Sequence, residues 1–263
     1  YASSRLEGMT TPDRRPASER IADELRQAIS AGQLAPGAKL PSERELADQY
    51  GTARNTVRQA IRLLSESGLV VAEHGRGVFV RAASNLIRLG NDRYSPKHRE
   101  TGLSPFLIEC AKQGKAGRFE VLFVERVVPP EYVARRLNLS TDSESVLQRE
   151  NVFWADSDPV QGVTTWIPWT IAQGTELLND VIGHPYGIHG VFEDQGHTMA
   201  RLDDEISARM PTPDERERMQ LPPGVPVIDV LHTSLDQDGV PYELTRFVLR
   251  ADLSGLRYNV PVE

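Results

Sequence analysis

The sequence predicts an α+β protein of two domains: an N-terminal winged helix-turn-helix and a C-terminal antiparallel sheet with helices. Three observations predict it. Residues 52–67 form an amphipathic pattern with one cationic face, a glycine-rich hairpin follows at once, and a helix–turn–hairpin pattern occurs twice in the second half. The 263 residues are enough for two ordinary domains, each with its own core.

Residues 52–67 predict a helix with two unlike faces. At the spacing of one helix face the apolar residues are Val57, Ala60, Ile61 and Leu64. The opposite face carries Arg54, Arg58 and Arg62, with Asn55 beside the first. Thr52 is expected to cap the start, and Gly68 to take the left-handed conformation after the end. Because Arg and Asn pair with guanine and adenine edges, this face suits the DNA major groove. A solvated helix face is the alternative.

The neighbouring segments favour DNA binding. Residues 1–17 are expected to be a disordered tail, with Met9 a candidate for the natural start. Ser18 caps a predicted helix over 19–31, and the capping box of Ser42 and Glu45 opens a second helix that stops at Gly51. The short strands in 69–81 flank a Gly-rich tip, which predicts a β-hairpin wing. No helix follows the tip, so a phosphate-binding loop is disfavoured.

Residues 18–82 resemble the winged helix-turn-helix of the GntR superfamily of bacterial repressors. The runs that carry the resemblance are Gly32–Ala47 with its Leu-Pro-Ser-Glu-Arg-Glu-Leu-Ala, Gly51–Arg58, and Gly68–Gly77 with its His-Gly-Arg-Gly. The resemblance implies contacts with double-stranded DNA from Ser42, Arg44, Arg54, Asn55, Thr56, Arg58, His74, Gly75 and Arg76. Ala53 departs from the pattern, because many relatives have Ser or Thr there. The alternative for Arg44 is an ion pair with Asp48, and Arg62 is expected to be solvated.

The net charge of −7 conceals a division between the two halves. Residues 14–82 hold 11 Lys and Arg against 8 Asp and Glu, whereas residues 104–263 hold 14 against 25. Only the first half therefore suits a polyanion. No stretch approaches the roughly 20 apolar residues of a membrane span, so no membrane partner is expected. No secretory leader is evident. The single cysteine, Cys110, excludes an internal disulfide, fits the cytoplasm and is expected to be buried.

The chain after the first domain divides into a linker and a second domain. Residues 83–103 lack clear periodicity and are expected to be a linker, with one short strand as an option. Its basic residues are expected to be solvated, with a position near DNA as the alternative; they are Arg88, Arg93, Lys97, His98 and Arg99. The pattern helix, polar turn and hairpin then occurs at 131–167 and again at 213–249. Two such halves that pair their hairpins predict one antiparallel sheet, with helices on one side.

Residues 104–263 resemble the UTRA effector domain of the HutC subfamily, which is similar to the chorismate lyase fold. The motifs are Leu137-Asn-Leu139, Val146-Leu-Gln-Arg149, Ala155-Asp-Ser-Asp-Pro-Val160, Trp166-Ile-Pro168 and Gly239-Val-Pro-Tyr-Glu243. The resemblance implies a homodimer that binds a small-molecule effector in a cleft. The matching cleft positions are Arg149, Asn151, Phe153, His184 and Glu243.

The cleft positions differ from those of members that bind sugar phosphates. Those members share an Arg-x-Arg where this chain has Asn151 and Phe153. Because two guanidinium groups are missing, a phosphate would lack its two-pronged partners. We therefore expect an amphipathic or partly aromatic effector rather than a sugar phosphate, with Arg149 as a candidate anion partner. Core packing of Phe153 and a surface ion pair between Arg149 and Glu150 are the alternatives.

Together these features predict a dimeric, ligand-responsive bacterial transcriptional regulator. We expect a repressor that binds a pseudo-palindromic operator and is released by a small metabolite. A constitutive repressor with a vestigial pocket is one alternative. A lyase-like enzyme is another, disfavoured because no activated nucleophile or acid–base pair is evident. Metal ions and other cofactors are not expected, since His184, His189 and His197 lack the spacing and Cys partners of a zinc site.

Overall fold

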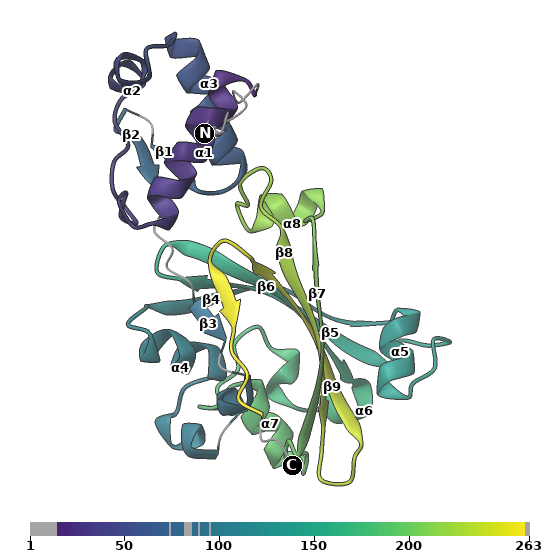
Figure 1. The fold of residues 1–263 in the computed structure, drawn as a ribbon. Helices are drawn as coiled ribbons and strands as arrows, with labels where there is room; N and C mark the ends of the chain where they lie inside the picture. Colours follow the sequence, from purple (N-terminus) through teal and green to yellow (C-terminus); the bar gives the residue numbers. More distant parts are fainter. Residues whose placement is uncertain (1–14, 74, 82–85, 89, 95, 261–263) are drawn as a thin grey trace, which may run out of the picture. The chain divides into compact units, whose positions relative to one another are not determined.

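The computed structural model describes residues 15–73, 75–81, 86–88, 90–94 and 96–260 (Figure 1). The chain divides into two compact units, residues 1–82 and 83–263. The predicted α+β class is confirmed, because the first unit is a helix-turn-helix with a hairpin and the second is an antiparallel sheet with helices.

The N-terminal unit packs three helices against a hairpin. Its elements are α1 (Ala17–Ser30), α2 (Glu43–Tyr50), α3 (Arg54–Glu66), β1 (Val70–Glu73) and β2 (Gly77–Val80). The predicted apolar stripe of α3 is buried in the core of this unit. The capping box is formed: the Ser42 hydroxyl accepts from the Glu45 amide at 3.2 Å, and the Ser42 amide donates to the Glu45 carboxylate at 2.7 Å. Gly68 is left-handed, with φ of +70°.

Three details of this unit differ from the sequence expectation. Ser18 does not cap the first helix, because α1 begins at Ala17 and its N-cap is Pro16, with no side-chain hydrogen bond. Thr52 does not cap α3; the N-cap is Ala53, whose backbone is extended and whose side chain has no oxygen to accept a hydrogen bond. The hairpin also gains a third extended segment, because the Leu40 amide donates to the Val78 carbonyl at 2.8 Å. This segment places Lys39 opposite Phe79 at the wing.

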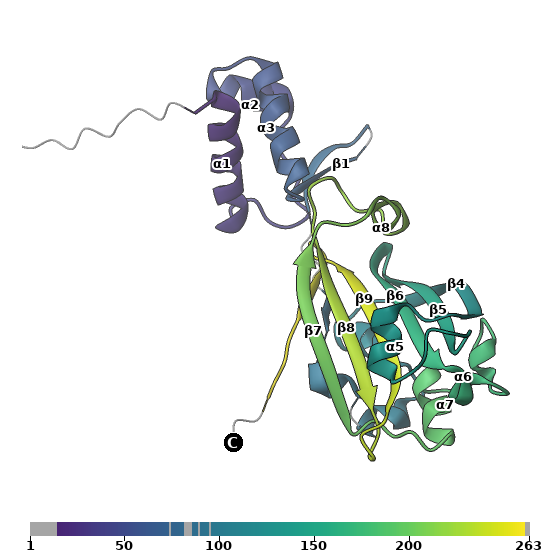
Figure 2. The same ribbon diagram turned by 90° about the vertical axis from the view of Figure 1, so that its right-hand side faces the viewer.

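The C-terminal unit is built on a six-stranded antiparallel sheet in the order β4-β5-β6-β9-β8-β7 (Figure 2). The strands are β4 (Gly117–Val127), β5 (Val146–Ala155), β6 (Asp158–Pro168), β7 (Arg201–Arg209), β8 (Val227–Leu235) and β9 (Pro241–Arg250). The predicted repeat is present, since hairpins β5–β6 and β8–β9 join through β6 and β9. At this junction Thr165 lies opposite Thr245, and their hydroxyls are 2.9 Å apart.

Helices lie on both faces of the sheet, which corrects the expectation of one side. The short helices are α4 (Pro105–Lys112), α5 (Glu131–Leu137), α6 (Trp169–Ala172), η3 (Glu176–Leu178), α7 (Ile188–Asp194) and α8 (Pro213–Arg218). Adjacent residues of β5 show the division: Val146 packs with α5, whereas Leu147 packs with α6 and α7. The amphipathic period of a short helix does not show which face of a sheet it will cover.

The described part of residues 83–103 is not a solvated linker, which corrects that prediction. The described part forms β3 (Leu86–Arg88), η1 (Gly90–Tyr94) and η2 (Pro96–Thr101), and β3 pairs in parallel with β10 (Ser254–Leu256). Arg88, Arg93 and His98 are buried. The Arg88 guanidinium lies 3.8 Å from the Phe247 ring centroid, and Arg93 forms an ion pair with Glu109 of α4. Long-range partners therefore hold a segment that has no periodicity of its own.

Two further expectations concern single features. Cys110 is buried, and burial raises the pKa of its thiol to about 12. In the part of the chain that the structure describes, no helix has the length and apolar character needed to cross a bilayer.

Candidate DNA-contacting surface and effector cavity

The exposed face of α3 presents the predicted DNA-contacting side chains. Arg54, Asn55 and Arg58 are exposed, and Thr56 is partly exposed. They are held on a rigid helix because its opposite face is buried in the core. No side-chain hydrogen bond caps the start of α3, so its first amides are available to an anion such as a phosphate.

Arg58 is engaged by an acid from the preceding helix. Its Nη2 lies 2.8 Å from Oε2 of Glu43, and its Nε lies 3.1 Å from Oε1. The hydrogen bond and the charge of Arg58 lower the pKa of the Glu43 carboxyl group. Any contact of Arg58 with DNA therefore competes with Glu43.

Arg44, Arg62 and Ser42, at the start and along the exposed side of the two helices, have partners of their own. Arg44 lies 4.0 Å from Asp48, at the limit of an ion pair and with both side chains exposed. Arg62 pairs with Glu66 at 2.8 Å, as a solvated helix face would. The Ser42 hydroxyl is used by the capping box. Ser42 is nevertheless exposed, at the start of α2.

The wing carries a second cation that sequence analysis missed. The Arg76 guanidinium lies 5.4 Å from the Phe79 ring centroid, and the Lys39 ammonium lies 6.0 Å from the same centroid. Lys39 was missed because it lies well before the wing strands in the sequence and reaches them only through the third extended segment. Gly75 is left-handed at the tip, and His74 lies outside the described residues.

The C-terminal unit contains a cavity of about 240 Å³ that gathers the five predicted effector residues. Arg149, Asn151 and Phe153 reach it from β5, Glu243 from β9 and His184 from the loop before α7. The other walls are largely apolar and aromatic; they include Phe106, Phe119, Val163, Ile182, Tyr186, Ile188 and Phe247. Sequence analysis missed these aromatic walls, which come from elements far apart in the chain.

Arg149 is buried and holds one wall of the cavity. Its guanidinium donates to the carbonyls of Leu177, Asn179 (2.8 Å) and Asp180 (3.3 Å). Glu150, the expected surface partner, pairs instead with Arg218. Burial lowers the pKa of Arg149, and no carboxylate bonds to the guanidinium among the described residues. The guanidinium thus already donates hydrogen bonds to three backbone carbonyls, which weakens the case for Arg149 as the partner of an anionic effector.

Glu243 is a buried carboxylate with two hydroxyl donors. Ser234 donates to it at 2.7 Å and Thr245 at 2.8 Å. Burial alone would raise the pKa of Glu243. The charges of His189 and His232 and the hydrogen bonds from the two hydroxyls have the larger effect, so the pKa of Glu243 is lowered. The carboxylate can therefore accept hydrogen bonds from a bound molecule.

His184 and His189 belong to the polar lining, which also includes Arg93, Ser104, Thr165, Asp180 and Thr245. The His184 Nδ1 accepts from the Tyr186 amide at 3.1 Å, and the His184 amide donates to Glu176 at 3.1 Å. A Cβ atom at Gly190 would lie 1.7 Å from His184 Nδ1, so only glycine fits beside this ring. Burial lowers the pKa of His189 to about 4, although the charge of neighbouring Glu243 opposes this shift.

A buried hydrogen-bonded chain continues from Glu243 across the sheet. Ser234 contacts Nε2 of His232 at 3.2 Å, the other ring nitrogen contacts Asp204, and Tyr258 donates to Asp204 at 2.7 Å. The order Ser–His–Asp matches a hydrolase triad. However, Ser234 is fully buried, does not line the cavity and directs its proton to Glu243. The chain therefore positions the carboxylate instead of activating a nucleophile.

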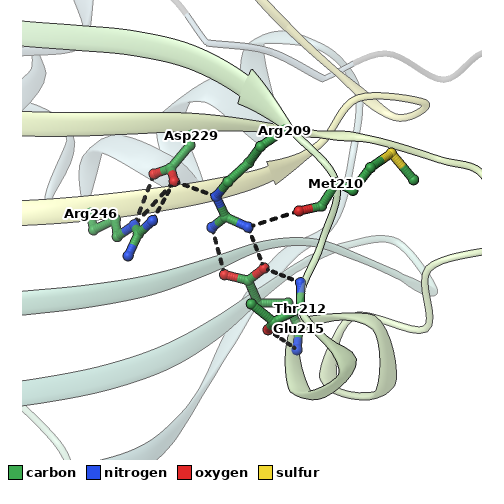
Figure 3. Close-up of polar contacts among 6 residues, drawn as sticks. All are labelled: Arg209, Met210, Thr212, Glu215, Asp229 and Arg246. Carbon is green, nitrogen blue, oxygen red and sulfur yellow. Dashed lines mark hydrogen bonds and ion pairs between the residues drawn. The ribbon is translucent and has the colours of Figure 1, made fainter.

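An ion-pair network braces the opposite face of the sheet (Figure 3). Asp229 accepts from Arg209 at 2.7 Å and from Arg246 at 2.9 Å, and Arg209 also pairs with Glu215 of α8. These pairs join β7, β8 and β9 to α8, away from the cavity. Among the described residues, no cluster of three or more His, Cys, Asp or Glu side chains could hold a metal ion.

An exposed cationic helix-turn-helix with a wing, together with a separate unit that encloses a small cavity, defines a DNA-binding regulator with an effector domain. Comparison with family models gives the same division. Residues 17–80 match the bacterial regulatory proteins of the gntR family, and residues 112–253 match the UTRA domain. The chain belongs to the GntR family and carries a UTRA domain, as the HutC subfamily does.

Relatives agree over nearly the whole length. The chain is 28% identical over 249 residues to the HTH-type transcriptional regulator GgaR of Escherichia coli strain K12, covering 94% of this chain and 92% of that one. It is 26% identical over 242 residues to the HTH-type transcriptional repressor NagR of Bacillus subtilis strain 168, covering 90% and 91%. A crystal structure of a GntR-family transcriptional regulator matches with a TM-score of 0.62 and 25% identity, covering 95% and 99%. The protein is therefore a transcriptional regulator and not an enzyme.

Proposed function

We propose that the protein is a homodimeric repressor that binds a pseudo-palindromic operator and is released by a small-molecule effector. The observation that carries the proposal is the cavity, which brings five expected effector residues to one place in a unit separate from the DNA-contacting surface. The name of NagR, a transcriptional repressor, supports the sign of regulation. Such a protein acts in the cytoplasm, beside the chromosome.

The DNA-binding role is assigned to α2, α3 and the wing. Arg54, Asn55 and Arg58 contact base edges, because their side chains are exposed on one face of α3. Thr56, Ser42 and Arg44 contact the backbone at the start of the two helices, and Gly75 and Arg76 bring the wing to the DNA. His74 belongs to this set by sequence. Lys39 joins it because its ammonium, like the Arg76 guanidinium, lies over the Phe79 ring of the wing.

The effector is assigned by the chemistry of the cavity. Phe153, Phe119 and Phe247 offer an apolar and aromatic surface, while the ionised Glu243 accepts hydrogen bonds. A hydroxyl or amine donor on an apolar body fits this lining. A sugar phosphate fits poorly, since Asn151 and Phe153 carry no cation and Arg149 is bonded to three carbonyls. Arg93 also lines the cavity, but its guanidinium is paired with Glu109.

Release requires that the effector binds one conformation of the dimer better than the other. The effector would favour a geometry in which the two winged units no longer match the spacing of the half-sites. By linkage, operator DNA would weaken effector binding by the same factor. This reciprocity gives a second measurement of the same coupling.

Operator binding by the purified protein tests the proposal. Duplex DNA from upstream of the protein's own gene is titrated at fixed salt, with and without fractions of cell metabolites, because affinity for DNA depends strongly on salt. Release by one fraction supports a ligand-gated repressor and provides the effector for purification. Tight binding that no fraction changes supports the constitutive alternative. Failure to bind any duplex in preference to random DNA contradicts both.

A further inference from the structure

We propose that the face of the sheet opposite the effector cavity holds a second ligand site, which binds a small metabolite through its phosphate or carboxylate group. The site is a hollow of about 500 Å³ between α5 and the strands β7, β8 and β9. Among the described residues it shares no lining residue with the effector cavity. Its own lining includes Tyr132, Arg135, Arg136, Glu205, Asp229 and Arg246.

The hollow exists because α5 is too short to cover the sheet as far as β7. The helix has seven residues, and its apolar face packs on β5, β6 and β9. β7 lies beyond β8, and its side chains are all exposed or partly exposed (Figure 2). Across the floor of the hollow, Glu205 lies opposite Leu231, and Leu231 lies opposite Arg246. The strand register therefore fixes which charged side chains face the hollow.

The lining of the hollow contains one more cation than carboxylate. Arg136 forms an ion pair with Glu205, and the Arg246 Nε donates to Oδ1 of Asp229 at 2.9 Å. Arg135 is exposed, and no carboxylate in the described part of the chain pairs with it. A guanidinium binds an oxyanion through two parallel N–H donors. The uncompensated charge therefore suits a phosphate or carboxylate group.

Arg246 can bind a ligand while it keeps its protein partner. Asp229 accepts from Nε and Nη2 of Arg246, and it also accepts from Arg209 at 2.7 Å. The third nitrogen of Arg246, Nη1, points away from Asp229 (Figure 3). Nη1 carries two of the five N–H donors of the guanidinium. The carboxylate therefore holds Arg246 in place while a second edge of the guanidinium stays available to a ligand oxygen.

Tyr132 adds a hydroxyl donor beside Arg246. Burial raises the pKa of Tyr132, and this effect outweighs the charge and the hydrogen bond of Arg246, which lower it. The hydroxyl is therefore protonated at neutral pH. It can donate to a ligand oxygen while it accepts from Arg246. Two positive groups and a hydroxyl thus converge on the same part of the hollow.

The surrounding charge favours a small anion over DNA. Residues 104–263 hold 25 Asp and Glu against 14 Lys and Arg, so this unit repels a polyanion at long range. A small oxyanion can instead come within hydrogen-bonding distance of the guanidinium groups. Glu205 competes for Arg136, but its side chain is 65% exposed. Because an ion pair with an exposed carboxylate contributes little, a ligand can replace Glu205 at Arg136.

Titration of the full-length chain with two simple anions tests the site. The Tyr132 ring lies edge-on to Trp166 at 5.8 Å between centroids, so binding in the hollow should change tryptophan emission. Inorganic phosphate is one probe and malonate, a dicarboxylate, is the other, each at constant ionic strength set with NaCl. A saturable change supports the site, and the tighter probe identifies the preferred group. A change no larger than that with NaCl alone, for both probes, overturns the proposal.

Substitutions locate the bound anion. Arg135→Gln and Arg136→Gln should each raise the dissociation constant for the tighter probe about three- to tenfold, because a charge-assisted contact is lost. Glu205→Gln should lower it, since the carboxylate no longer competes for Arg136. Arg216→Gln, which changes an exposed arginine of α8, is the matched control and should have no effect. An unchanged constant in both of the first two variants, or an equal loss in the control, would show that the anion does not bind in the hollow.

Unfolding in urea separates binding from the general effect of the probe. Phosphate stabilises folded proteins because it is excluded from their surfaces. A ligand that binds only the folded chain adds stabilisation that grows with its concentration relative to Kd. The tighter probe should therefore raise the free energy of unfolding more in wild type than in the combined Arg135→Gln and Arg136→Gln variant, each compared with its own value without probe. Equal rises would refute the site. These variants leave the effector cavity and α3 intact, so failure here does not affect the proposed function.

Discussion

Arg58 of α3 and Glu43 of α2 form a two-pronged ion pair, with Nη2 to Oε2 at 2.8 Å and Nε to Oε1 at 3.1 Å. The pair joins the two helices of the helix-turn-helix on its solvent side. It also means that a guanidinium assigned to DNA is already bonded to a carboxylate in the free protein.

Substitution of Arg58 and substitution of Glu43 should change operator affinity in opposite directions. Arg58→Ala should weaken binding roughly tenfold or more, because a base-edge contact is lost. Glu43→Gln should strengthen binding at low salt, since it removes an acid that competes for Arg58 and repels phosphate. Fluorescence anisotropy at fixed salt measures both, with Arg62→Ala as the control on the same helix. Weaker binding by Glu43→Gln would show that Glu43 positions Arg58 for DNA.

The uncapped start of α3 predicts a stabilising substitution. Ala53→Ser should add a side-chain oxygen at the N-cap that accepts a hydrogen bond from the first turn. The free energy of opening of the first helical amides, measured by hydrogen exchange, should rise by about 0.5–1 kcal/mol. Thr52→Ala is the matched control, because Thr52 is not the cap. Loss of protection in the control would indicate that Thr52 caps the helix in solution.

The aromatic wall of the cavity predicts a change confined to effector response. Phe153 has ring contacts with Phe106 at 4.8 Å and Phe119 at 5.6 Å between centroids. Phe153→Leu should weaken effector binding about two- to tenfold while operator binding is unchanged. Phe123→Leu, on the other face of the sheet, is the control and should alter neither. An aggregated Phe153→Leu protein would favour the core-packing interpretation.

His189 predicts a dependence of stability on pH. Its pKa is about 4 in the folded chain, because burial disfavours the charged ring, and 6.5 without that burial. Between these values the unfolded chain binds more protons than the folded chain, so the free energy of unfolding falls as pH is lowered, by at most about 1.4 kcal/mol per pH unit. The carboxylates of Glu243 and Asp204, whose pKa values are lowered, add a loss only under more acidic conditions.

Urea unfolding followed by tryptophan fluorescence measures this dependence in the C-terminal unit alone, since Trp154, Trp166 and Trp169 all lie there. His189→Asn should flatten the curve between pH 6.5 and 4.5. An equal slope in wild type and variant would show that another group is responsible.

The network of Figure 3 predicts a stability effect without a functional one. Asp229→Asn should lower the free energy of unfolding by about 1–3 kcal/mol, because Arg209 and Arg246 lose a shared charged acceptor. Arg218→Gln, which removes the more exposed pair with Glu150, should cost about 0–1 kcal/mol. Tryptophan fluorescence in urea measures both. A higher free energy of unfolding for Asp229→Asn would mean that desolvation of these charges costs more free energy than their attraction contributes.

Local patterns predicted the elements that depend on neighbouring residues. The stripe from Val57 to Leu64, the capping box of Ser42 and Glu45, and the two hairpins are all present, because period and turn chemistry act within a few residues. The register of the second hairpin also places Ser234 opposite Glu243, a hydrogen-bonded pair that the turn at 237–239 could have indicated.

Features that depend on distant partners could not be predicted. Arg88 and Arg93 looked solvated because the sequence does not show that Phe247 and Glu109 would cover them. Arg149 was placed on the correct strand, but its carbonyl partners come from a loop about thirty residues away. The GntR and UTRA resemblances anticipated the cavity, whereas its aromatic walls needed the fold.

Gly190 has no side chain, yet it limits the space around His184, since even a methyl group there would overlap the ring. Any larger residue would have to push His184 aside and so reshape the cavity. Over evolutionary time, ligand preference in proteins of this kind could therefore diverge through position 190 while every residue that touches the ligand stayed the same. A comparison restricted to ligand-contacting residues would miss such a change.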